Sequence, residues 1–193
     1  MVNARFAQLH DYPKLLADSA AQLLPRWYRE VLWKPPAVFN PTFYENLGAA
    51  LPKMKEVVQQ LYEVGVRIHA GSDTPNPFVV PGAGLHEELH LLVEAGLTPE
   101  EVWMAATRWA GESLGMPKLG TLQEGAPADF LLFREDPTRD LATLSTLEAV
   151  VAQGRLYPKP VLDVAFIRHR DHFNGWLYDR LTMAIARWIT AGE

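Results

Sequence analysis

The sequence contains no cysteine among its 193 residues, which excludes a disulfide framework, a thiolate metal site and a cysteine nucleophile. It also lacks a basic excess. The formal net charge is −5, and a phosphate-binding surface needs a positive patch, so we expect no nucleic-acid partner. The start MVNARFAQLHDYP has no apolar signal region, and no run approaches the roughly 18 apolar residues of a membrane span. We therefore expect a cytoplasmic protein with no membrane partner.

Helical patterns dominate what is present. Apolar spacing predicts helices over residues 12–31, with a kink or a split at Pro25, and over 41–63, 85–95, 98–114 and 161–190. Thr98, Pro99 and Glu101 form a capping-box signature at the start of the fourth helix. Gly65 is a natural stop for the second helix.

Two regions predict strands instead. A short apolar run, Val66 to Ala70, indicates one buried strand, and residues 119–158 indicate short strands with turns at Glu124-Gly125 and Gln153-Gly154. The predicted organisation is a helical region over 1–118 with one strand at 66–70, a strand region over 119–158 and a C-terminal helix over 159–193. This is an α+β protein that is mostly helical.

Four stretches then carry a family resemblance: GVRIHAGSDTPNP, LHEELHLLVEAGLTPEEVWMAAT, LGTLQEGAPADFLLFREDP and AVVAQGRLY, in this order over residues 65–157. Together they resemble the C-terminal part of a metal-dependent amidohydrolase of the imidazolonepropionase-like branch. The resemblance implies a (β/α)₈ barrel with a small β-sandwich and an active site at the C-terminal mouth of the barrel. It also implies a divalent metal, for which we expect zinc, and a metal-activated water that cleaves small ester, amide or phosphotriester bonds.

The resemblance is incomplete, because a whole barrel takes about 250 residues. The family's His-x-His motif on the first strand has no counterpart here, and the only histidine before residue 69 is His10. We therefore expect a truncated remnant of the α/β barrel with part of the sandwich. A lone strand and half a sandwich leave open edges and apolar faces, so we expect self-association into a homo-oligomer to complete them.

Asp73 matches the family's metal-binding aspartate, which takes a proton from the water at the end of the last barrel strand. The alternative is a turn or capping role with Thr74. Alternate residues of a strand share a face, so an extended chain would point His69 and Asp73 the same way. His69 is then either a metal ligand or a buried histidine bonded to a carbonyl group. Phe78 and Asn76 are predicted to line the pocket of a small-molecule substrate.

His86, Glu87 and His90 fit the metalloprotease pattern HExxH, in which two histidines one helical turn apart bind zinc. The continuation of that motif is absent, since Val93 stands where glycine would be needed. A less demanding prediction keeps His86 and His90 as metal ligands near Asp73, with His86 also catalytic. The alternative is that both histidines sit at the edge of the core.

Three other groups of residues are weaker candidates for a catalytic site, a metal site or a contact surface. Ser72 beside His69 and Asp73 could form a nucleophilic trio, but adjacent side chains rarely do. His169 and His172 have metal-compatible spacing, although an exposed helix face explains them better. Helical spacing favours packing, or an oligomer contact, for four tryptophans: Trp103, Trp109, Trp176 and Trp188.

Three functional hypotheses follow from these residues. The first is a truncated amidohydrolase-like hydrolase, the second a non-catalytic remnant that self-associates, and the third a metal-independent esterase. Sensitivity to a chelator separates the first from the third.

Overall fold

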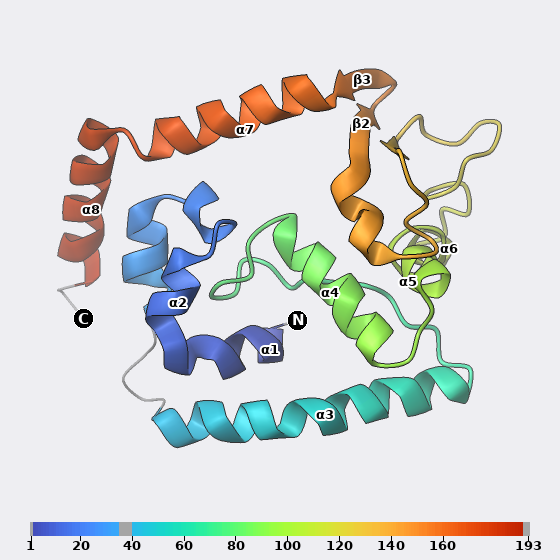
Figure 1. The fold of residues 1–193 in the computed structure, drawn as a ribbon, viewed down its shortest axis with the longest axis horizontal. Helices are drawn as coiled ribbons and strands as arrows, with labels where there is room; N and C mark the ends of the chain where they lie inside the picture. Colours follow the sequence, from blue (N-terminus) through green and yellow to red (C-terminus); the bar gives the residue numbers. More distant parts are fainter. Residues whose placement is uncertain (1, 35–39, 191–193) are drawn as a thin grey trace. The chain divides into compact units, whose positions relative to one another are not determined.

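The computed structural model describes residues 2–34 and 40–190, which are mostly helical (Figure 1). The chain divides into two compact units. Unit 1 consists of residues 1–51, 72–84 and 164–193, and unit 2 of residues 52–71 and 85–163. In the described part of the chain, no helix combines the length and hydropathy needed to cross a membrane.

Unit 1 is built from short helical turns and longer helices. Its elements are α1 (Val2–Ala7), the 3-10 turns η1 (Gln8–Asp11) and η2 (Ala21–Leu23), α2 (Tyr12–Ala17), the π-helix η3 (Tyr28–Leu32), the first half of α3 (Pro41–Glu63), most of α7 (Lys159–Phe173) and α8 (Trp176–Thr190). The predicted helix over 12–31 is split at Pro25 rather than kinked. Leu24 is extended (φ −99°, ψ 151°), because the following Pro25 disfavours the helical conformation at this position.

The core of unit 1 is rich in aromatic side chains that come from distant parts of the sequence. Its buried members are Leu9, Leu15, Ala21, Trp33, Tyr44, Phe78 and Val80. Met183 and Ala186 are the buried residues of α8.

Unit 2 begins with the second half of α3, whose bounds confirm the predicted helix over 41–63. Gly65 ends it with a left-handed φ of 88°, and its N–H donates to the carbonyl of Tyr62 at 2.9 Å. Next come α4 (Ala83–Glu94), which starts in unit 1, α5 (Pro99–Ala106) and α6 (Arg108–Ser113). The capping box between Thr98 and Glu101 is confirmed, with both of its hydrogen bonds present.

The predicted continuous helix over 98–114 is broken at Thr107 (φ −131°, ψ −94°). Gly120 approaches this break so closely that a Cβ atom on it would lie 2.4 Å from the carbonyl carbon of Thr107. The turn that follows α6 therefore packs backbone against backbone at the break.

A three-stranded antiparallel sheet lies within the predicted strand region. Its order is β1 (Phe130–Phe133), β2 (Leu147–Ala152), β3 (Arg155–Pro158). Gln153 and Gly154 join β2 to β3 with φ values of 51° and 74°, the paired left-handed conformations of a tight hairpin turn. The predicted turn at this position is confirmed.

Two further predictions about regular structure fail in the described residues. Residues 66–70 form no strand, and Ala70 N–H only reaches the carbonyl of Ala105 at 3.3 Å. A barrel strand needs neighbours to pair with, and here the three strands pair with one another. The predicted C-terminal helix is two helices, α7 (Lys159–Phe173) and α8, separated at Asn174 and Gly175, since glycine weakens a helix interior.

Candidate functional site

Asp73 lies in the loop that connects the end of α3 to α4. Its backbone is left-handed, with a φ of 54°, a conformation that aspartate tolerates better than most residues. The carbonyl of Asp73 accepts two hydrogen bonds from Asn76, at 3.3 Å from the backbone nitrogen and 2.8 Å from Nδ2. The side chain is exposed, and no described residue hydrogen-bonds or ion-pairs with its carboxylate. The loop therefore leaves this carboxylate accessible.

Phe78 anchors the same loop in the core of unit 1. Only 2% of it is exposed, and its ring lies 5.6 Å edge-on from Tyr12 and 4.9 Å from Trp33, measured between centroids. Thr74 Oγ1 closes the loop by donating to the carbonyl of Val79 at 2.8 Å. Burial explains Phe78, and the bonds to Asp73 explain Asn76, so a substrate contact by either residue stays a prediction.

His69 lies in unit 2, whereas Asp73 lies in unit 1. The expectation that both point the same way depended on a strand that does not form. His69 is exposed, and its Nε2 lies 3.0 Å from the hydroxyl oxygen of Ser113. It is therefore not the buried, carbonyl-bonded histidine that we considered as the alternative to a metal ligand.

His86 and His90 lie one turn apart on α4 and are both exposed, while Leu89 and Leu92 of the same helix are buried. This position fits the predicted edge of the core. Partial desolvation holds the pKa of His86 below its ordinary value, and repulsion from a protonated His90 adds to the effect. A lowered pKa favours the neutral imidazole, which is the form that binds metals.

The predicted ligands do not complete a metal site. Within residues 2–34 and 40–190, no three His, Asp or Glu side chains come together as a group that could hold a metal ion. Asp73, His69, His86 and His90 would supply ligands of the right chemical type. These four residues do not form a complete metal site by themselves.

The C-terminal histidines have structural partners. His169 Nε2 lies 3.0 Å from the carbonyl oxygen of Leu23, and its ring meets Phe173 edge-on at 4.7 Å. The ring of His172 meets Phe173 edge-on at 5.0 Å and lies tilted against Tyr178 at 5.4 Å. These contacts favour the expected helix-face role over metal binding.

The tryptophans divide into two groups. Trp103 packs against the core of unit 2, and its indole nitrogen donates to the carbonyl of Pro137 at 2.8 Å. Trp176 and Trp188 are 72% and 80% exposed. Packing is therefore confirmed for Trp103 and wrong for Trp176 and Trp188, for which the alternative of an oligomer contact remains.

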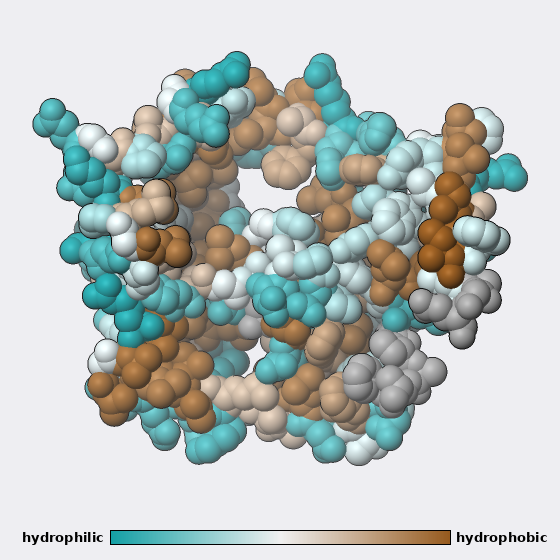
Figure 2. Space-filling view, turned by 180° about the vertical axis from the view of Figure 1, so that it is seen from behind, coloured by the Kyte–Doolittle hydropathy of each residue, from teal (hydrophilic) through white to brown (hydrophobic). Residues whose placement is uncertain are grey.

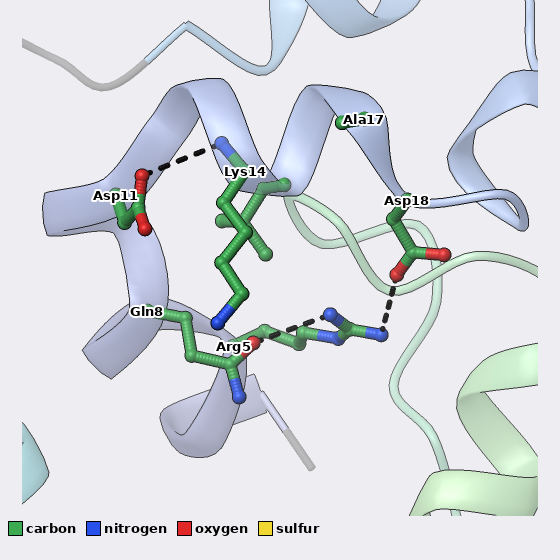
Figure 3. Close-up of a pocket in the computed structure, with 7 residues that line it drawn as sticks. Arg5, Gln8, Asp11, Lys14, Ala17 and Asp18 are labelled. Atoms are coloured by element: carbon green, nitrogen blue, oxygen red, sulfur yellow. Dashed lines mark hydrogen bonds and ion pairs between the residues drawn. The ribbon is translucent and has the colours of Figure 1, made fainter.

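Sequence reasoning missed a cavity of about 420 Å³ in unit 1 (Figure 3). Arg5, with 9% of its side chain exposed, lines it and bonds to Gln8 at 3.2 Å and to Asp18 at 3.3 Å. Asp11 and Lys14 also contribute to the lining. No motif predicts this site, because its residues are joined by tertiary contacts of η1 and the short helices beside it. Both terminal nitrogens of Arg5 are engaged, one by Gln8 and the other by Asp18.

Comparison with known proteins supports the resemblance. Residues 46–157 match the family model described as "Amidohydrolase family". The chain is 37% identical over 86 residues to an imidazolonepropionase of Photorhabdus laumondii subsp. laumondii and 35% identical over 83 residues to one of Salmonella agona. These matches cover 44% and 42% of the chain but only 20% of each relative. The chain thus spans about a fifth of the length of the curated relatives it matches.

Solved structures show the same relationship. A structure titled "AH, Bottromycin amidohydrolase" superposes with a TM-score of 0.69 at 26% identity, over 89% of this chain and 39% of its own. The crystal structure of another amidohydrolase superposes with a TM-score of 0.51 at 26% identity, over 68% of this chain and 32% of its own. The chain therefore has the fold of a part of larger amidohydrolase structures.

Proposed function

The chain belongs to the amidohydrolase family, and from this premise we propose that it contributes Asp73 to the active site of a hydrolase for small molecules. The observation that supports this proposal is the Asp73 loop. Its carboxylate is exposed and unbonded in the described residues, while Asn76 holds its backbone and Phe78 anchors the loop. A fixed loop with a free carboxylate is the arrangement that a general base requires.

The chemistry that this carboxylate can supply is proton acceptance from a water molecule that attacks an acyl or phosphoryl centre. Since the relatives are named as amidohydrolases, amide bonds come first among the proposed substrates, before esters and phosphotriesters. A divalent metal, when bound, would make the water acidic enough to react near neutral pH. His69, His86 and His90 would hold such a metal only together with ligands from elsewhere, and zinc remains the metal that we expect.

Two other functions stay open for specific reasons. The absence of a three-ligand group in the described residues favours a non-catalytic remnant or a metal-independent esterase. The open outer edges of β1 and β3 support self-association that completes the sheet. A monomer in sedimentation at micromolar concentration would contradict that association.

The test is hydrolysis of a panel of chromogenic anilides, esters and phosphotriesters, before chelation, after it and after zinc is restored. We expect activity that the chelator removes and zinc restores, and a loss of at least about a hundredfold in Asp73→Asn, the scale of removing a general base. Asp163→Asn, in an exposed ion pair with Lys159, is the matched control and should retain full activity.

Other results of the same assay would support one of the two alternative functions or contradict the role of Asp73. Hydrolysis that the chelator does not reduce would identify a metal-independent esterase. A folded sample without any activity would identify a non-catalytic chain. Equal losses in Asp73→Asn and Asp163→Asn would remove Asp73 from the active site.

A further inference from the structure

Helix α8 is apolar on two opposite faces. Met183 and Ala186 are buried against unit 1. The opposite face forms an exposed apolar stripe with helical spacing, and each member is more than half exposed: Leu177 55%, Leu181 56%, Ile185 57% and Trp188 80%. Figure 2 shows a column of hydrophobic side chains over α8 at the right-hand edge. A stripe of this size marks an interaction surface.

Two arginines follow one flank of the α8 stripe. Arg180 and Arg187 lie seven residues apart, which places them on the same side of the helix. Both are exposed, and neither forms an ion pair with a described residue. The partner of this surface should therefore carry an apolar stripe with a row of carboxylates beside it.

The second half of α3 has that pattern. Val57 and Leu61 of α3, with Val64 in the turn directly after it, follow one another at helical spacing and are 44%, 41% and 77% exposed. Figure 2 shows a hydrophobic patch at the lower left, over this end of α3. Glu56 and Glu63, also seven residues apart, flank this stripe.

The present bonds of these glutamates are easily exchanged. Glu56 pairs with Lys53 at 2.6 Å and Glu63 accepts from Gln59 at 2.9 Å, and both contacts are exposed. Exposed pairs of this kind contribute little to stability, so a partner's arginine can replace them.

The two charged rows also lie on matching sides. Viewed from each N-terminus at about 100° per residue, the arginine row of α8 and the glutamate row of α3 fall on the same flank of their stripes. Rows on the same flank meet when two helices pack antiparallel. We propose that α8 of one copy packs antiparallel on α3 of a second copy, with Arg180 opposite Glu63 and Arg187 opposite Glu56.

The charges also disfavour the packing of either helix on the same helix of a second copy. Antiparallel packing of α8 on α8 would oppose the arginine rows, and α3 on α3 would oppose the glutamate rows, so both place like charges together. In the proposed register, Leu181 falls between Val64 and Leu61, and the two stripes interdigitate as in an antiparallel helical pair. The surface differs from the edges of the sheet, and the inference does not depend on catalysis.

Charge exchange tests the proposal on the full chain by sedimentation velocity over a micromolar concentration series. The variant Arg180→Glu/Arg187→Glu and the variant Glu56→Arg/Glu63→Arg should each weaken self-association by about tenfold or more, the range for close charge pairs at interfaces. The variant with all four changes restores the opposite charges and should return to within about threefold of the native association.

Arg139→Glu/Arg168→Glu is the matched control, since it changes the net charge equally at exposed sites away from both stripes. Circular dichroism confirms that each variant is folded. The proposal is overturned if the native chain is monomeric throughout the series, if the fourfold variant fails to recover, or if the control weakens association as much as the arginine reversals.

Discussion

The two units differ in how their cores are assembled and in how well a family pattern describes them. Unit 1 gathers aromatic residues from distant segments, such as Tyr12, Trp33 and Phe78, around the Asp73 loop. The core of unit 2 is mainly aliphatic: Leu89, Leu92, Leu97, Val102 and Leu141. The family match over 46–157 includes all of unit 2 except its last six residues, but it omits residues 1–45 and 164–193 of unit 1. The family match therefore includes both unit 2 and the Asp73 loop, whereas helices outside the match hold that loop in unit 1.

The variant Phe78→Ala tests most directly whether unit 1 unfolds separately from unit 2. Deleting a large buried aromatic side chain removes its transfer free energy and leaves a cavity, so we expect a loss of about 3–5 kcal/mol in the free energy of unfolding. Hydrogen exchange should show lost protection in unit 1 while the amides of α5 in unit 2 stay protected.

Leu122→Ala is the control for Phe78→Ala, because Leu122 is 82% exposed and its truncation should change stability by less than about 0.5 kcal/mol. If α5 lost protection together with unit 1, the two units would unfold as one, and the distinction between them would have no energetic meaning.

The next largest effect probes backbone packing in unit 2. Gly120→Ala places a Cβ atom 2.4 Å from the carbonyl carbon of Thr107, at a left-handed φ of 72°. Gly115 has the same φ of 72°, with nothing within 4 Å of its Cβ position. Gly115→Ala should cost about 1 kcal/mol for its conformation alone.

Gly120→Ala should cost about 2 kcal/mol more than Gly115→Ala, because the backbone must also move. Chemical denaturation measures both variants. Equal losses would mean that the backbone at Thr107 moves away from the added Cβ atom without a further cost in stability. The close packing of this turn would then not stabilise unit 2.

Local signals account for what could be predicted from the sequence. The α3 bounds, the Thr98 capping box and the turn at Gln153 each depend on neighbouring residues, and each was confirmed. The strand at 66–70 failed because a strand depends on partners that lie elsewhere in a barrel.

The candidate site shows the same limit. Asp73 was found from its motif, but its support by Asn76 and the burial of Phe78 depend on helices far along the chain. The cavity beside Arg5 left no sequence signal, since its ion pair joins residues 13 positions apart.

The smallest predicted effect concerns the pH dependence of unit 2. The pKa of Glu101 lies below its ordinary value of 4.5, first because Tyr62 donates a hydrogen bond to its carboxylate at 2.5 Å, and then because Thr98 donates through its backbone. A depressed folded-state pKa means that this stabilisation is complete above the unfolded-state pKa and is lost as the pH falls through the folded-state value. The native chain should therefore lose its advantage over Glu101→Gln as the pH drops below about 4.5.

Denaturation of both proteins between neutral pH and acid measures that difference. Glu100→Gln is the control, because it removes a carboxylate from the same turn but none of these hydrogen bonds. A difference between the native chain and Glu101→Gln that stayed constant to the acid limit would mean that the capping box holds through its hydrogen-bond geometry alone, and that the charge of Glu101 adds nothing to unit 2.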